Sequence, residues 1–142
     1  MAIQTDELLL HANDQSKIAA AIDAAEQRTS VEFHVHVEAT SRYPEARARD
    51  LLRMAIARGH RRQGMLLYLL AHERRCYVVT DEQIRPLEGT RLWRDVVNRL
   101  VLDLLHGKLG DGVADAVGRF SHIVAGHFPA GSANVPTRSA VR

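Results

Sequence analysis

The sequence predicts an α/β fold, a three-layer α/β/α sandwich around a small mixed sheet. Residues 64–71 are continuously apolar, which is typical of a central strand covered on both faces. Residues 31–38 alternate between apolar and polar, and a helical pattern separates the two segments. Because a strand–helix–strand crossover implies a parallel pair, we expect helices on both faces of the sheet.

The first half of the chain reads as helix, strand, helix. The first helix is predicted from an N-cap at Asp14 to about Arg28, with apolar residues at helical spacing. The strand 31–38 follows and carries its polar residues on one face. After a turn at 40–44, a second helix is expected over 45–59.

The second half reads as strand, strand, helix, helix. Three residues separate the strand 64–71 from a strand over 75–80, a length that suits a hairpin and adds an antiparallel strand. Thr90 is predicted to cap a helix that runs through His106. Asp111 is predicted to cap the last helix.

The 142 residues are expected to form one domain over 1–129, followed by a disordered basic tail over 130–142. The single cysteine excludes an intrachain disulfide. The N-terminus lacks the basic start and apolar run of a signal peptide, and the longest apolar run, 65–71, is too short to cross a bilayer. We therefore expect a cytoplasmic protein without a membrane span.

Three acidic residues are predicted to gather at one end of the sheet. If the first two strands are parallel and the third is antiparallel to the second, Glu32, Asp81 and Glu82 come close together. Such carboxylates suit Ca²⁺ or Mg²⁺, and they also suit the acid/base pair of a hydrolase. The alternative is that Asp81 and Glu82 are solvated turn residues.

The polar face of the strand 31–38 carries His34 and His36 between two glutamates. Residues two apart on a strand project to the same side, so the pair could bind zinc or another transition metal. The sequence does not place a third ligand. The alternative, and the commoner role of strand histidines, is a polar outer face.

Arginine is concentrated in residues 42–62, which hold seven arginines against Glu45 and Asp50. This excess of positive charge could attract phosphates or an acidic partner. Because arginine outnumbers lysine 17 to 2 in the whole chain, a solvated helix face is the alternative. Nucleic acid is not expected as a partner, since the few aromatic residues do not interleave with the arginines.

Several short stretches between residues 14 and 129 match one family in order and spacing. They are Ile18–Ile22 with Glu26, Thr29–Glu32, Gln63–Leu67, Arg74–Asp81, Leu105–Leu109 with Asp111–Gly112, and His127–Pro129. Through them the chain resembles the TPM domain family, whose plant member is a thylakoid lumen phosphatase. The last stretch looks like the ending of a short, stand-alone bacterial form.

The resemblance implies the same α/β/α sandwich, calcium or magnesium binding, and the acid phosphatase activity reported for some members. The family's acidic residues at the sheet end correspond best to Glu32, Asp81 and Glu82. Where the family often has Asp-Asn before the strand glycine, this chain has Arg62 and Gln63. A cation therefore stands where the family has a carboxylate.

Three functions follow from these observations. The leading hypothesis is a TPM-like module that binds an ion or a protein partner. The second is a divalent-metal-dependent phosphatase acting on phosphate monoesters, in which Glu32 and Asp81 hold the metal and Arg61 or Arg62 orients the phosphate. The third is an adaptor that presents the arginine-rich helix face to an acidic partner. The sequence indicates neither the partner nor the oligomeric state.

Overall fold

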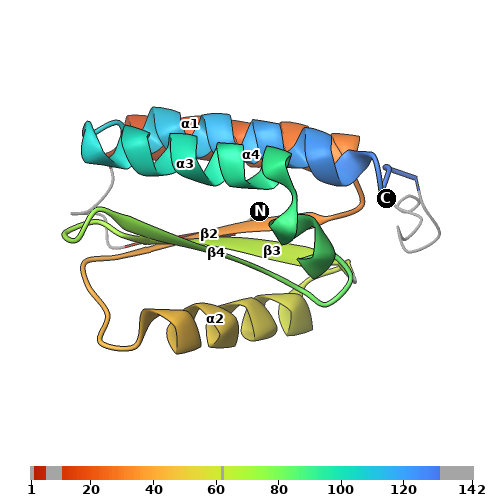
Figure 1. The fold of residues 1–142 in the computed structure, drawn as a ribbon, viewed down its shortest axis with the longest axis horizontal. Helices are drawn as coiled ribbons and strands as arrows, with labels where there is room; N and C mark the ends of the chain where they lie inside the picture. The colour runs from red at the N-terminus through yellow and green to blue at the C-terminus, as the bar shows by residue number, and fades with distance from the viewer. Residues whose placement is uncertain (1, 6–10, 62, 132–142) are drawn as a thin grey trace.

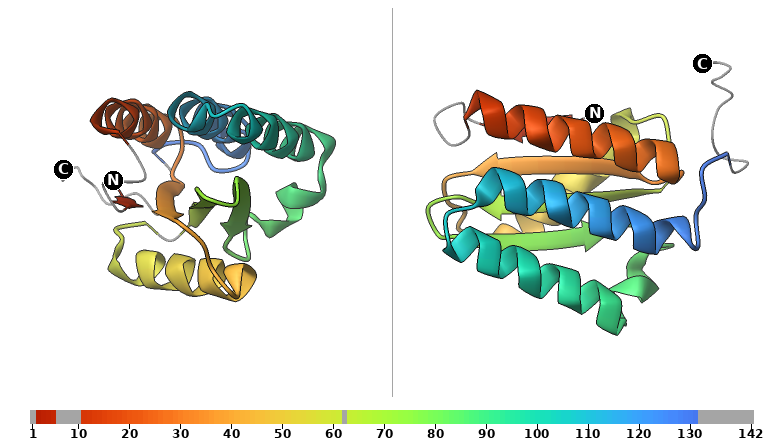
Figure 2. Two further views of the ribbon diagram at one scale, coloured as in Figure 1. Left: turned by 90° about the vertical axis from the view of Figure 1, so that its left-hand side faces the viewer. Right: turned by 90° about the horizontal axis from the view of Figure 1, so that it is seen from above.

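The computed structural model describes residues 2–5, 11–61 and 63–131 and confirms the three-layer sandwich (Figure 1). Helices cover both faces of the sheet (Figure 2). The elements in chain order are β1 (Ala2–Thr5), α1 (Ala12–Arg28), β2 (Glu32–Glu38), α2 (Pro44–Arg58), β3 (Gly64–Leu70), β4 (Arg75–Thr80), the 3₁₀ helix η1 (Arg85–Gly89), α3 (Arg91–Leu105) and α4 (Leu109–Ala125).

The sheet has four strands in the order β1-β2-β3-β4. The pairing of β2 with β3 is parallel and that of β3 with β4 is antiparallel, which confirms the crossover and the hairpin. No strand was predicted over residues 2–5, yet β1 pairs in parallel with β2, with Ala2 opposite His34. A four-residue segment is too short to show a period, so only its pairing with β2 defines it.

The strand β3 is buried along its whole length, as its sequence predicts. Met65, Leu67 and Leu69 face the larger core, which is formed with α1, α3 and α4. Leu66, Tyr68 and Leu70 face a smaller core beneath α2. In the larger core the rings of Trp93 and Phe120 lie 4.4 Å apart between their centroids.

Two of the three predicted helix caps are wrong. Asp14 lies inside the first turn of α1, which begins at Ala12. Asp111 lies inside α4, and its carboxylate accepts a hydrogen bond of 2.8 Å from Lys17 Nζ on α1. Both acids still stand near the positive end of a helix dipole. Thr90 is confirmed as a cap, since its hydroxyl accepts the Trp93 N–H of α3.

The chain after α4 returns to the end of α1. The Phe128 carbonyl accepts hydrogen bonds from the Thr29 hydroxyl and from the Ser30 N–H, the latter at 3.0 Å. Ala130 N–H donates to the Arg28 carbonyl. Of the tail predicted over 130–142, residues 132–142 lie outside the described residues. No helix in the described ranges combines the length and the apolar character needed to cross a membrane.

Two glycines let α4 lie close to its neighbours, between α1 and α3 (Figure 2). A Cβ atom at Gly110 would lie 2.6 Å from the Asp14 Cβ of α1. A Cβ atom at Gly112 would lie 2.6 Å from the Asp103 Cβ of α3. A helical glycine costs stability by itself, so these two are explained by the close approach that they permit.

We predict that Gly110→Ala lowers the free energy of unfolding by about 1–3 kcal/mol, because the added methyl group forces α1 away from α4. The matched control is Gly118→Ala in the same helix, where the new Cβ meets nothing within 4 Å. This control should raise stability by about 0.5–1 kcal/mol. Urea unfolding of the two variants measures both effects, and equal stabilisation by both would contradict the close packing.

Candidate functional site

The predicted end of the sheet forms as expected at the level of the backbone. Glu32 N–H donates to the Gln63 carbonyl at 2.9 Å, and Asp81 N–H donates to the Gly64 carbonyl at 3.2 Å. Glu32 and Asp81 therefore flank the start of β3 on opposite sides. Their side chains, however, point to different partners.

The Asp81 carboxylate binds the backbone. Its Oδ2 accepts the Gly64 N–H at 2.7 Å, and its Oδ1 accepts the N–H groups of Gln83 and Ile84 at 2.8 and 3.1 Å. These bonds join the start of β3 to the turn after β4, as aspartate commonly does in turns. Glu82, next to it, is exposed.

The Glu32 side chain lies on the α2 face of the sheet. Its Oε1 is 3.5 Å from Nε2 of His34 and is packed against Gly59, at a place that a Cβ at residue 59 would occupy. His34 is only 5% exposed, and neither of its ring nitrogens has a hydrogen-bond partner among the described residues. Glu32 and His34 thus form a buried polar pair beneath the end of α2.

The predicted anion ligand Arg61 is also bound to the backbone. Its guanidinium donates to the carbonyls of Glu26, Thr29 and Val31 at 3.0, 2.8 and 3.2 Å. These bonds hold the end of α1 against the start of β2. Arg62 lies outside the described residues.

The three predicted cation ligands therefore share one end of the sheet without converging on one point. Within residues 2–5, 11–61 and 63–131, no group of three histidine, cysteine, aspartate or glutamate side chains is placed to hold a metal ion. As placed, Glu32, Asp81 and Glu82 do not fit a three-carboxylate site. Calcium or magnesium binding by Glu32, Asp81 and Glu82 stays a prediction of the sequence.

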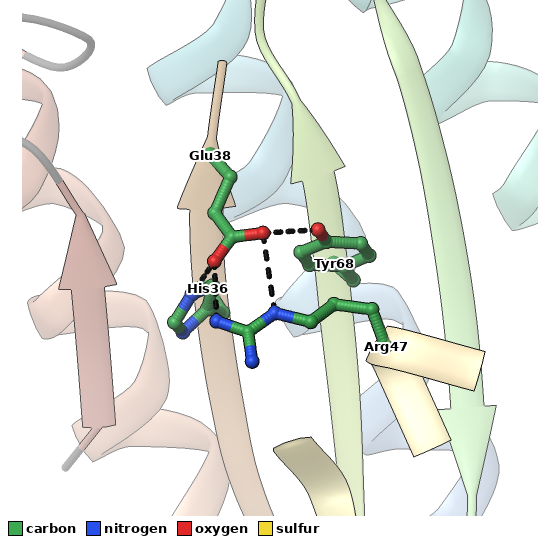
Figure 3. Close-up of polar contacts among 4 residues, drawn as sticks. All are labelled: His36, Glu38, Arg47 and Tyr68. Carbon is green, nitrogen blue, oxygen red and sulfur yellow. Dashed lines mark hydrogen bonds and ion pairs between the residues drawn. The ribbon is translucent and has the colours of Figure 1, made fainter. Parts of the chain in front are cut away.

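The predicted His34–His36 pair does not act on one point, because each histidine faces a different carboxylate. His34 faces Glu32, whereas Nε2 of His36 lies 2.9 Å from Oε2 of Glu38. Glu38 also accepts a hydrogen bond of 2.6 Å from Nη2 of Arg47 on α2 and one from the Tyr68 hydroxyl on β3 (Figure 3). This network joins β2, β3 and α2. Its members Arg47 and Tyr68 were not predicted from the sequence.

A signal for Tyr68 is visible in retrospect. It has the only side-chain polar group in the apolar run of β3, and a buried tyrosine hydroxyl needs a partner. Tyr68 stands opposite His36 in the parallel register, and Glu38 is two residues after His36 on the same strand. Arg47 gave no such signal, because which flank of α2 faces β2 depends on how the helix packs.

The arginines of α2 are separated by helical geometry. Arg47 points towards β2, whereas Arg49 and Arg53 line a groove of about 440 Å³ between α2 and β4. Arg85 of η1 lies at the same groove. The sequence predicted one arginine face but did not reveal this groove, because β4 and η1 reach it only through the fold.

Comparison with known proteins places the whole architecture in one group. A family model described as TPM domain matches residues 3–123. The BA42 protein of the psychrophilic bacterium Bizionia argentinensis is 25% identical, with a TM-score of 0.78 over 89% of this chain and 88% of that chain. The N-terminal domain of cg2496 from Corynebacterium glutamicum shares the fold at 17% identity, with a TM-score of 0.62 over 85% of this chain and 78% of that one. No curated protein matches the chain.

We predict that Asp81→Asn lowers the free energy of unfolding by about 1–3 kcal/mol in the presence of a chelator, because the amide cannot accept all three backbone N–H groups as well. Glu82→Gln, its exposed neighbour, should change stability by less than about 0.5 kcal/mol. Thermal melting with added calcium or magnesium then tests the predicted ion. An increase in melting temperature that Glu82→Gln removes would support that site, and wild-type stability of Asp81→Asn would contradict the backbone role.

A second prediction concerns Glu38, whose environment lowers its pKa to about 2. Burial raises this pKa, but the hydrogen bonds from Arg47, Tyr68 and His36 together lower it further. The folded pKa lies below the unfolded one, so the stabilisation is present above about pH 4.5 and is lost as the pH falls towards 2. The stability difference between wild type and Glu38→Gln, measured by urea unfolding, should shrink over that range.

The matched control for this experiment is Asp50→Asn, which removes an exposed i,i+3 pair with Arg53. Surface pairs of this kind contribute little, so its effect should stay small at every pH. A difference between wild type and Glu38→Gln that persists unchanged to pH 2 would contradict the assigned pKa.

Proposed function

Since the chain belongs to the TPM domain family, we propose that it serves as a binding module of that fold and that the outer face of α2 takes an acidic protein partner. The observation that carries the proposal is the composition of this face. Tyr43, at the N-cap of α2, is 69% exposed and Met54 is 49% exposed, and Arg42, Arg49, Arg53 and Arg58 are exposed as well. Aromatic residues, methionine and arginine are the residue types enriched at protein interfaces.

The positive charge of this face is available to a partner. Among the described residues, Arg49 and Arg58 form no hydrogen bond or ion pair. Arg42 lies 6.0 Å from the ring centroid of Tyr43, and Arg53 pairs only with Asp50 of the same helix. An acidic surface would gain charge-assisted contacts here without breaking any contact of the fold.

The structure supports this function better than hydrolysis of phosphate esters. The phosphatase hypothesis assigns the metal to Glu32 and Asp81 and the phosphate to Arg61 or Arg62. The side chains of Asp81 and Arg61 are hydrogen-bonded to the backbone, so a metal or phosphate there would compete with bonds that hold the sheet end together. We therefore do not extend the proposal to catalysis.

Binding to a fluorescently labelled amphipathic peptide of glutamate and leucine tests the proposal by fluorescence anisotropy. We expect saturable binding that weakens as salt is added, because exposed charges are screened. The double variant Arg42→Glu/Arg58→Glu should weaken binding by about tenfold or more. The matched control is Arg91→Glu/Arg99→Glu, which reverses two exposed arginines on α3.

Three results would contradict the proposal. They are equal losses in the two double variants, equal binding of a glutamine–leucine peptide, and tighter binding to a DNA oligonucleotide of the same charge than to the acidic peptide. The last result would assign the arginine face to nucleic acid instead.

A further inference from the structure

The groove between α2 and β4 has an apolar floor. Leu52 and Ile56 of α2 and Tyr77 and Val79 of β4 line it, and all four belong to the smaller core or pack against it. Among the described residues, α2 is the α-helix that packs on this face of the sheet, and β4 is the edge strand, so the groove lies at the border of the smaller core. At about 440 Å³ the groove has the size of a small-molecule site.

Three arginines from two separate elements surround this floor. Arg49 and Arg53 come from α2 and Arg85 from η1. Arg49 has no polar partner among the described residues, and Arg53 pairs with Asp50, which is not among the groove-lining residues. Arg85 has one long hydrogen bond of 3.5 Å to the Thr80 carbonyl. The guanidinium groups therefore retain most of their donors.

Most carboxylates of the groove, in contrast, already accept hydrogen bonds within the protein. Both oxygens of Asp81 accept backbone N–H groups, and Glu88 accepts the Thr80 hydroxyl at 2.5 Å. Of the acids in the lining, only Glu45 has no such bond. The groups of the groove that remain free to form hydrogen bonds are therefore mainly the N–H donors of the arginines, which suit an anion.

From this juxtaposition we propose that the groove binds a small amphipathic organic anion. Its apolar body, an aryl or alkyl group, lies on Leu52, Ile56, Tyr77 and Val79. Its carboxylate, sulfonate or phosphate lies between the guanidinium groups of Arg49 and Arg85. An inorganic ion alone leaves the floor uncovered, and an uncharged apolar molecule leaves the arginines without an acceptor, so the site selects for both properties.

This site is separate from the protein-binding face proposed above. Arg42, just before α2, and Arg58, its last residue, do not line the groove, whereas Arg85 of η1 does. The two proposals share Arg49 and Arg53. Variants of the unshared arginines therefore separate the failure of one proposal from the failure of the other.

The probe for the experiment is anilinonaphthalene sulfonate, which combines an aryl body with one anionic group and fluoresces in apolar surroundings. We expect a single saturable site on the folded protein at neutral pH. Saturating probe should also raise the melting temperature, because binding to the folded state stabilises it by mass action. Arg85→Gln and Arg49→Gln should each weaken binding by roughly tenfold.

Two matched controls accompany these variants. Arg99→Gln removes an exposed arginine of α3 and should leave probe binding unchanged. Phenylnaphthylamine, which has the same aryl body without the sulfonate, should bind at least about tenfold more weakly to wild type. Arg42→Glu/Arg58→Glu, which tests the protein-binding face, should bind the probe like wild type.

The proposal is overturned by equal affinity of the charged and uncharged probes, by wild-type affinity of both Arg85→Gln and Arg49→Gln, or by a probe that lowers the melting temperature. The last result means that the dye binds unfolded chain. If the wild-type protein binds the probe but does not bind the acidic peptide, the protein-binding function is wrong and this site still stands.

Discussion

A strand without a charged side chain must be covered on both faces, and β3 is such a strand. Its seven residues are all buried, between β2 and β4 in the sheet and between helices on the two faces. The parallel crossover from β2 puts α2 on one face, while α1, α3 and α4 close the other. The three-layer architecture follows from this requirement. The two outer layers are unequal, because among the described residues α2 alone packs on one face and three α-helices pack on the other.

That asymmetry separates two kinds of surface. The face with three helices holds the larger core, and its packing is tight enough to require glycine where α4 meets its neighbours. The face with α2 holds a small core bordered by arginines, histidines and carboxylates. The polar clusters described above therefore lie on the α2 side of the sheet, and the larger apolar core lies on the opposite side.

The sequence predicted the elements with strong periodicity and missed what depends on tertiary contact. The alternating β2, the apolar β3 and the amphipathic α3 were placed almost to the residue. The strand β1 was missed because its four residues show no period without β2. At the candidate site, the predicted strand topology accounts for the positions of Glu32 and Asp81 on either side of the start of β3. Ion binding there stays a prediction. Sequence spacing does not reveal that backbone N–H groups saturate Asp81 or that three carbonyls engage Arg61.

The contact between α1 and α4 joins the first helix of the chain to the last, through Lys17 with Asp111 and the close approach at Gly110. On the ribosome, α1 is therefore synthesised long before the helix that covers it. Its apolar residues Ile18, Ile22 and Ala25 stay exposed until synthesis has passed α4. The larger core therefore cannot be completed one element at a time as the chain is synthesised. Until α4 has been synthesised, the apolar face of α1 lacks the helix that covers it and is a site of aggregation.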